Sequence, residues 1–444
     1  MVNEEVAAGV GKILKAARSI TTRYATKRYT NVLAADRKAI AAGLLAIGDT
    51  DVPLLILSKD SRVTPLPGTP APPPVDPPES TPMKWNPGHF MLSDTFAIPA
   101  TDAPEALGYS IAQLDDYASL GVNFHAYAFW RRLEETRGDY SAGFAWFDTL
   151  VALCAARGMR VSLQLVYTSF GGTSARHLPP YLATEPGGNG GWWTKSPAGS
   201  GVQAKIGLTA ISDRVIALIE AYGARYNGNP WVEMFQCHET SMAPGPDETK
   251  AGMGAQYVRW NTAMRAAWPN TLTSAHVNFT NSQSYESTFM ADCYAKGMAI
   301  GGPDVYPQTA GIHGAPIKAR TWADETYIGN VWNGSAWVSG GVDYRGKLPR
   351  MSHFADPIHG RDNVGCYTTA QLYDWALSEF GNSHMFHSPK TYAFSGSQPQ
   401  VYYNSGTNPR IRDWLADNLA SKPTNTTFPT RFTELGYAPQ TGGT

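Results

Sequence analysis

The stretch Asn229–Met242, NPWVEMFQCHETSM, runs from an apolar segment directly into an acid. Its apolar part predicts a buried strand over Trp231–Glu239, and turn-forming residues follow almost at once. A carboxylate at the end of a buried strand costs free energy unless it is paired or used, so Glu239 is a candidate functional group. The alternative is a structural ion pair with an arginine such as Arg132.

Segments of the same kind recur along the chain and alternate with helical patterns. The predicted strands are Lys84–Leu92, Gly121–Trp130, Arg160–Tyr167, Trp231–Glu239, Thr271–Phe279, Met298–Pro307, Leu348–Asp356 and His384–Phe394. The predicted helices are Ile111–Leu120, Phe144–Arg157, Ile206–Tyr226, Tyr257–Trp268, Tyr285–Lys296, Thr369–Phe380 and Asn408–Ala420, with a long loop or small hairpin over 308–347. This order predicts an α/β fold, a (β/α)8 TIM barrel. A doubly wound sheet competes, but its usual Gly-rich phosphate turn is missing from the sequence.

The barrel is expected over residues 83–425, and the flanking segments differ from it in composition. Residues 1–62 are Ala-rich with one apolar stripe, which predicts a helical arm; it is either a solvated helix or a docking segment. Residues 63–82 contain TPLPGTPAPPPVDPPESTP, and so much proline predicts an extended, semi-rigid linker. Residues 426–444 are expected to form a C-terminal tail.

Composition excludes several classes of function. The formal net charge is -1 and only 16% of residues are charged, which argues against a nucleic-acid partner. There is no apolar stretch long enough to span a membrane, and the acidic start does not resemble a secretory signal. The four cysteines lack metal spacing and HExxH is absent, so we expect free thiols, no metal and no cofactor.

Polar side chains cluster where the predicted strands end, which is the rim that carries the active site in TIM barrels. They include Arg132, Glu134, His238, Glu239, His276, Asn278, Asp304, Tyr306, His353 and Asp356. Carboxylates among aromatic rings are typical of glycoside hydrolysis, in which one acid protonates the leaving oxygen. Burial is expected to raise the pKa of Glu239 and so suit it to that role. Trp192 and Trp193 lie in a predicted loop, where they either pack or stack on sugar.

Two stretches resemble clan A glycoside hydrolases, the group that includes β-galactosidase-like, cellulase-like and β-mannanase-like enzymes. The first is AYAFWRRLEETRGDYSAGFAWFDTLVALCAARGMRVSLQL, with Trp130 and Glu134 at motif positions. The second is RYNGNPWVEMFQCHE, which resembles the fourth strand of the clan. The resemblance implies that Glu239 is the acid/base. The stretch PDVYP resembles the sixth strand and implies that Tyr306 faces the site.

The sequence departs from the clan pattern at two positions. His238 stands where the clan has an asparagine before the acid, and its imidazole can still donate a hydrogen bond. The seventh strand, LPRMSHFADP, has no glutamate for the nucleophile, and His353 falls near the expected position. Asp356 is the nearest carboxylate and is the predicted nucleophile, with Asp304 and Glu325 as alternatives.

Three hypotheses about function follow from these patterns. The first is a glycosidase, with retention favoured, that uses Glu239 and Asp356 on a carbohydrate substrate. The second is a carbohydrate-binding barrel that has lost its nucleophile. The third is a structural or adaptor role, in which residues 1–62 bind an assembly partner. The first and third combine in a phage tail component, a virion protein that digests a host envelope glycan; a cytoplasmic glycosidase is the alternative.

Overall fold

The computed structural model describes residues 80–93, 109–169, 175–184, 190–194, 201–240, 244–277, 283–304, 322–354, 369–387 and 411–440. These residues all belong to the compact unit Glu79–Thr444. The predicted arm and most of the predicted linker lie outside the described residues. Within the described part of the chain, no helix is both long and apolar enough to cross a membrane.

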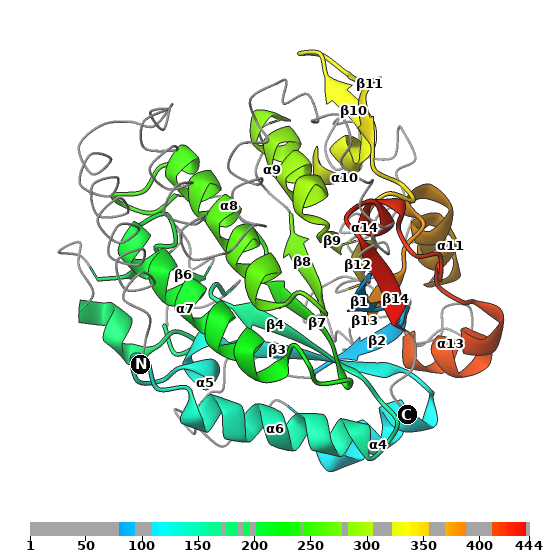
Figure 1. The fold of residues 1–444 in the computed structure, drawn as a ribbon, viewed down its shortest axis with the longest axis horizontal. Helices are drawn as coiled ribbons and strands as arrows, with labels where there is room; N and C mark the ends of the chain where they lie inside the picture. Colours follow the sequence, from blue (N-terminus) through cyan, green and yellow to red (C-terminus); the bar gives the residue numbers. More distant parts are fainter. Residues whose placement is uncertain are drawn as a thin grey trace, which may run out of the picture. The chain divides into compact units, whose positions relative to one another are not determined.

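Eight parallel strands in the described part of the chain close into a barrel, which confirms the predicted fold (Figure 1). In chain order they are β2 (Gly88–Leu92), β3 (Asn123–Phe129), β4 (Val161–Val166), β7 (Val232–Cys237), β8 (Leu272–His276), β9 (Ala299–Asp304), β12 (Arg350–Phe354) and β13 (His384–His387). Each strand pairs with its neighbour in the chain, and β13 pairs with β2 to close the ring. One barrel strand therefore lies within each of the eight predicted segments.

Burial on both faces explains the apolar character of these strands. In β4, Val161, Leu163 and Leu165 belong to the large apolar core shared with the helices. Val166 belongs to a second core with residues of the other strands, inside the barrel. Ser162 and Gln164 alternate with the outward residues and are also fully buried. Polar groups therefore occupy the barrel interior below the rim.

Helices cover the outside of the barrel. The main ones are α4 (Ile111–Ser119), α6 (Ser141–Ala155), α7 (Thr209–Tyr226), α8 (Lys250–Ala267), α9 (Gln283–Lys296), α11 (Thr369–Phe380) and α13 (Ile411–Asn418). Helices α7, α8 and α9 lie side by side (Figure 1). A Cβ atom at Gly223 would come within 2.6 Å of Ala267 Cβ, so this glycine allows the close approach of α7 and α8. The hydroxyl of Thr249 caps α8 by accepting from Gly252 N at 2.9 Å.

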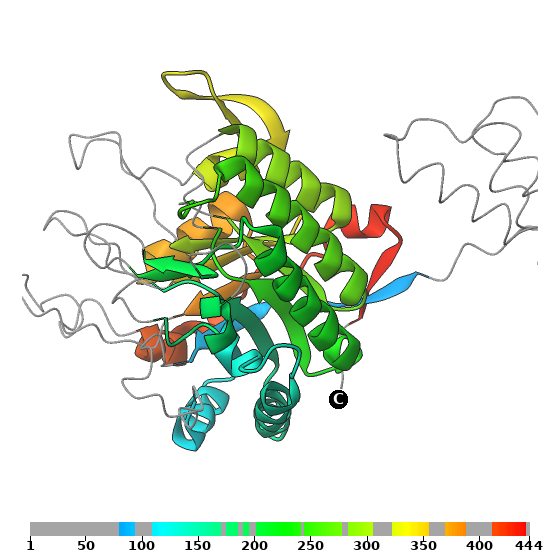
Figure 2. The same ribbon diagram turned by 90° about the vertical axis from the view of Figure 1, so that its left-hand side faces the viewer.

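Short elements complete the fold. They are α5 (Trp130–Leu133), η1 (Pro180–Thr184), β5 (Trp192–Thr194), β6 (Val202–Ala204), α10 (Trp322–Tyr327), β10 (Ile328–Trp332), β11 (Trp337–Asp343), η2 (Leu419–Ser421) and α14 (Thr430–Glu434). Strands β10 and β11 form an antiparallel hairpin that projects from the barrel, as Figures 1 and 2 show. The hairpin confirms one of the two alternatives predicted for 308–347, within the described residues of that range.

The predicted strand Lys84–Leu92 is wrong as a single element. It divides into β1 (Thr81–Lys84) and β2, and β1 pairs with β14 (Tyr437–Gln440) in parallel, outside the barrel. Pro87 lies between them, and proline has no N–H to donate to a ladder. Figure 2 shows β1 (blue) and β14 (red) together on one side of the barrel.

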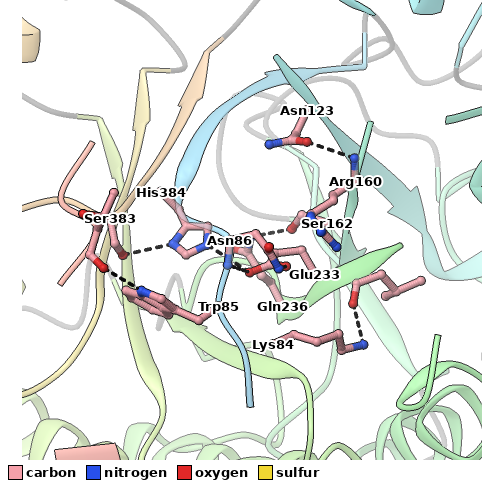
Figure 3. Close-up of polar contacts among 12 residues, drawn as sticks. Lys84, Trp85, Asn86, Asn123, Arg160, Ser162, Glu233, Gln236, Ser383 and His384 are labelled. Atoms are coloured by element: carbon pink, nitrogen blue, oxygen red, sulfur yellow. Dashed lines mark hydrogen bonds and ion pairs between the residues drawn. The ribbon is translucent and has the colours of Figure 1, made fainter. Parts of the chain in front are cut away.

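A buried polar cluster closes the amino end of the barrel (Figure 3). Glu233 accepts from the backbone N and Nδ2 of Asn86, both at 2.7 Å, and lies 3.5 Å from His384 Nε2. Burial alone would raise the pKa of Glu233, but His384 and Asn86 outweigh it and hold the pKa below its ordinary value. Lys84 Nζ donates to the carbonyls of Asn229 at 2.8 Å and Val232 at 2.6 Å. These contacts tie β1 to the start of β7.

Candidate active site at the carboxyl ends of the strands

The candidate acid lies directly after β7, at the carboxyl end of the barrel. His238, Glu239 and Thr240 follow the strand and are buried, with Glu239 9% exposed. Backbone hydrogen bonds extend the sheet past the strand, from His238 N to Leu165 O and from Thr240 N to His276 O, both at 2.9 Å. The backbone that carries Glu239 is therefore held between β4 and β8.

Two buried tyrosines hold the same backbone from the side. Tyr167 donates its hydroxyl to Glu239 O at 2.7 Å, with His238 O at 3.1 Å. Tyr257, on α8, donates to Thr240 O, and the two hydroxyl oxygens lie 3.1 Å apart. Burial raises the pKa of both tyrosines well above the ordinary value, so both keep their protons. They act as fixed donors that position the residues around the acid.

Neutral histidines lie in the barrel beneath this backbone. His125 Nε2 lies 2.8 Å from Gln164 Oε1, and Gln164 Nε2 lies 3.3 Å from His276 Nδ1. The amide nitrogen of Gln164 can only donate, so His276 accepts at Nδ1 and His125 donates from Nε2. Burial lowers the pKa of His125 to about 3 and that of His276 well below its ordinary value. Both rings are therefore neutral at physiological pH.

Aromatic rings surround the histidine that precedes the acid. The ring of His238 lies edge-on to Tyr127, with centroids 5.7 Å apart, and edge-on to Tyr167 at 6.1 Å. His276 lies 6.3 Å away, centroid to centroid. The structure thus brings together His238, Glu239 and His276 among the predicted site residues, at the carboxyl ends of β7 and β8.

Three of the other predicted site residues lie in the core or along its edge. Trp130 is fully buried and donates its Nε1 hydrogen to Glu134 Oε2 at 2.9 Å. Glu134 is also fully buried and accepts from Gly138 N at 2.7 Å, Tyr181 OH at 2.9 Å and Arg214. The guanidinium of Arg132 lies over the ring of Trp146, 5.9 Å from its centroid. Glu134 therefore anchors the segments around α5 and α7.

The remaining predicted carboxylates and their neighbours are described only in part. Asp356, Tyr306 and Asn278 lie outside the described residues. For Asp304 and His353 the structure gives the strand positions, which pair with each other at the carboxyl ends of β9 and β12. Glu325 is 6% exposed on α10, where it accepts from Asn330 Nδ2 at 2.5 Å.

A small ladder next to β4 carries polar groups that the sequence did not indicate. Trp193 in β5 pairs with Gln203 in β6, and Gln203 pairs with Thr168, just after β4. Residues directly opposite in a ladder project to the same side, so these three share one face. On the other face, Val202 and Ala204 belong to the apolar core.

Among the described residues, the polar atoms on this face are buried and have no hydrogen-bond partner. They are both amide atoms of Gln203, Thr168 Oγ1 and Trp193 Nε1. Such atoms normally find a partner in the protein or in bound water, so a face that carries all four of them is unusual. Trp192, also predicted to contact substrate, lies on the opposite face and packs against the apolar core.

The sequence predicts free thiols and no metal site. Within the described part of the chain, Cys154, Cys237 and Cys293 are free and buried. No group of three or more histidine, cysteine, aspartate or glutamate side chains suited to a metal ion occurs among the described residues.

Known proteins match this chain in structure but not in sequence. The sequence matches no family model and no curated protein. In structure, the chain is similar to the catalytic domain of β-amylase from Paenibacillus polymyxa, with 7% identity and a TM-score of 0.48 over 78% of this chain and 99% of that one. It is similar to a glycoside hydrolase at 16% identity and TM-score 0.43, over 77% and 100% of the two chains. It is also similar to endo-glycoceramidase II from Rhodococcus sp. at 15% identity and TM-score 0.46, over 76% and 81%. Each similarity is one of fold.

Proposed function

We propose that this chain is a glycoside hydrolase in which Glu239 is the proton donor. The observation that carries the proposal is the position of Glu239, a 9% exposed carboxylate at the carboxyl end of a barrel strand. Burial of a carboxyl group favours its protonated form, which is the form a general acid needs. The sequence resemblance of RYNGNPWVEMFQCHE to clan A enzymes supports the same role.

The proposed reaction is cleavage of a glycosidic bond in a poly- or oligosaccharide. Glu239 gives its proton to the leaving oxygen as the bond to the anomeric carbon breaks. Asp356, three residues after His353 of β12, is the proposed nucleophile, and it would form a glycosyl ester that water then hydrolyses with retention. His238 is proposed to donate a hydrogen bond to a sugar hydroxyl.

The test compares Glu239→Gln with the parent protein on two kinds of substrate. On a natural glycan, turnover should fall about 10²–10⁴-fold, the usual contribution of a general acid. On the dinitrophenyl glycoside of the same sugar, formation of the glycosyl ester should be nearly unaffected, because that leaving group departs without a proton. Equal turnover of the natural glycan by parent and variant would refute the role of Glu239.

The control variant is Glu135→Gln, which removes a carboxylate from an exposed ion pair with Arg131. It should leave turnover unchanged, because Glu135 lies on the surface. Equal unfolding temperatures for parent, Glu239→Gln and Glu135→Gln would show that any loss of turnover is not a loss of folding.

A second candidate function is a carbohydrate-binding barrel without hydrolysis. The sequence RMSHF of β12 favours it, because this strand ends without the glutamate that the clan pattern places there. This alternative expects saturable glycan binding and no new reducing ends. Reducing ends that form with the parent protein and not with Glu239→Gln would exclude it.

A further inference from the structure

A hollow of about 170 Å³ opens at the amino end of the barrel, on the opposite face from Glu239. Lys84, Asn86, Arg160, Asn227, Asn270 and Gln440 line it, together with the turn at Gly228 and Pro230. Lys84 ends β1 and Asn86 lies between β1 and β2. Arg160 precedes β4, and Asn227 and Asn270 precede β7 and β8. The hollow is therefore bounded by the starts of barrel strands and by the β1–β14 pair.

Among the described residues, the charged side chains that line the hollow are basic. They are Lys84 and Arg160, and the other described lining side chains are amides or apolar. The negative charge of Glu233 raises the pKa of Lys84, but the carboxylate oxygens of Glu233 face Asn86 and His384, as Figure 3 shows. The described lining thus carries two basic groups and no carboxylate.

The ammonium group of Lys84 is held in place with hydrogen-bonding capacity left over. Its side chain is 4% exposed, and two backbone carbonyls accept from Nζ. A lysine ammonium has three N–H donors, so one remains for a ligand. Burial lowers the pKa of Lys84 to about 7; the charge of Glu233 opposes this shift and that of Arg160 adds to it. A bound anion would favour the charged form.

Arg160 is positioned by contacts that leave part of its guanidinium open. Its Nη1 donates to Pro230 O at 2.5 Å, and the guanidinium lies over the ring of Trp231, 5.7 Å from the centroid. Its backbone N donates to Asn123 Oδ1 at 2.9 Å. Within the described residues, Nε and Nη2 donate to no acceptor, and this edge of the guanidinium can bind two oxygens of one anion.

We propose that this hollow is a binding site for an oxyanion, a sulfate, phosphate or carboxylate group held between Lys84 and Arg160. Both cations lose repulsion when an anion lies between them, and a planar guanidinium edge suits paired oxygens. The site is separate from the candidate active site and does not depend on sugar cleavage. It accounts for a lysine buried beside an arginine at the end of the barrel where TIM barrels usually carry stability and not chemistry.

Sulfate is the probe for the test, because its charge is constant across neutral pH. Sulfate stabilises most proteins through exclusion from their surface, so the measured quantity is the difference between variants. Titration calorimetry on the full chain should show saturable sulfate binding. Arg160→Met should weaken it at least about 10-fold, the effect of losing one charge-assisted bond. The matched control Arg225→Met removes an arginine that pairs with Asp148 on the surface and should change nothing.

Binding should also depend on pH. Affinity should be higher about one unit below the Lys84 pKa of about 7 than about one unit above it. Methyl sulfate in parallel distinguishes a free ion from a group carried on a larger molecule: binding of both indicates an ester, and binding of sulfate alone indicates a free ion. Absence of saturable sulfate binding, or equal affinity in parent and Arg160→Met, would overturn the proposal.

Discussion

Tyr167 is the residue that fixes the backbone of the candidate acid. We expect Tyr167→Phe to lower turnover about 10-fold with little change in KM, because the lost hydrogen bond lets the Glu239 backbone move. The free energy of unfolding should fall by about 1 kcal/mol, the net value of one hydrogen bond. The measurements are steady-state kinetics and urea unfolding.

Tyr222→Phe is the matched control for this prediction. Tyr222 is also fully buried and donates its hydroxyl to a backbone carbonyl, that of Leu133, at 3.2 Å. It should cost a similar free energy of unfolding and leave turnover unchanged. Equal losses of turnover in the two variants would show that Tyr167 acts on stability alone.

Gln203 provides a second prediction at this scale. Gln203→Met should leave the unfolding temperature equal or higher, because it removes buried amide atoms that have no hydrogen-bond partner within the described residues. A lower unfolding temperature in the variant would show that the amide stabilises the fold.

The sequence could predict a residue of the candidate site only where the position of that residue at the end of a strand was enough to identify it. Glu239 stood out because an apolar strand ended on an acid. Glu134 was predicted because it follows the second predicted strand, and Trp130 because it stands at a position of the clan A pattern. Both are fully buried, because neither ground fixes where a side chain points. Tyr257 was missed because it reaches the site from a helix, through a contact with a backbone carbonyl.

At the scale of elements, the contact between β1 and β7 should respond to pH. Lys84 has a folded pKa of about 7 against an ordinary value of 10.5, so the unfolded chain binds the proton more tightly. Stability should therefore rise with pH between these two values, by about 1.4 kcal/mol per unit. Lys84→Met should remove this rise. Unfolding in urea between pH about 7 and about 9, where few tyrosines titrate, measures it; identical slopes in parent and variant would contradict the prediction.

The long elements of the fold were predictable, and the short ones were not. Each barrel strand lies near its predicted segment because burial on both faces demands a continuous apolar run. Strands β5 and β6 have three residues each, too few for a periodic signal. Strand β14, with the sequence YAPQ, forms because β1 lies beside it, which no local pattern encodes.

For the molecule as a whole, buried neutral histidines should set the acid limit of stability. His89, His125, His276 and His387 all have lowered pKa values, with burial as the first cause. Below the ordinary value of about 6.5, the unfolded chain gains protons that the folded chain does not. As the pH decreases below this value, the free energy of unfolding should decrease by about 1.4 kcal/mol per pH unit for each such histidine.

The measurement is the free energy of unfolding between pH about 6.5 and about 5, above the range where most carboxylates titrate. His125→Asn should reduce the slope by the share of one histidine, because His125 is fully buried. A stability that does not change over this interval would refute the assignment of neutral histidines.

The parallel pairing of β1 with β14 has a mechanical consequence. Thr81 pairs with Tyr437 and Lys84 pairs with Gln440. The N-terminal end of β1 and the C-terminal end of β14 therefore lie at opposite ends of the ladder. Tension applied between residue 80 and residue 440 therefore loads all the ladder hydrogen bonds at once, in shear, and does not peel them one at a time. The barrel strands bear this force only after the hydrogen bonds between β1 and β14 have broken. The short β1–β14 pair therefore sets the force at which the unit begins to unfold.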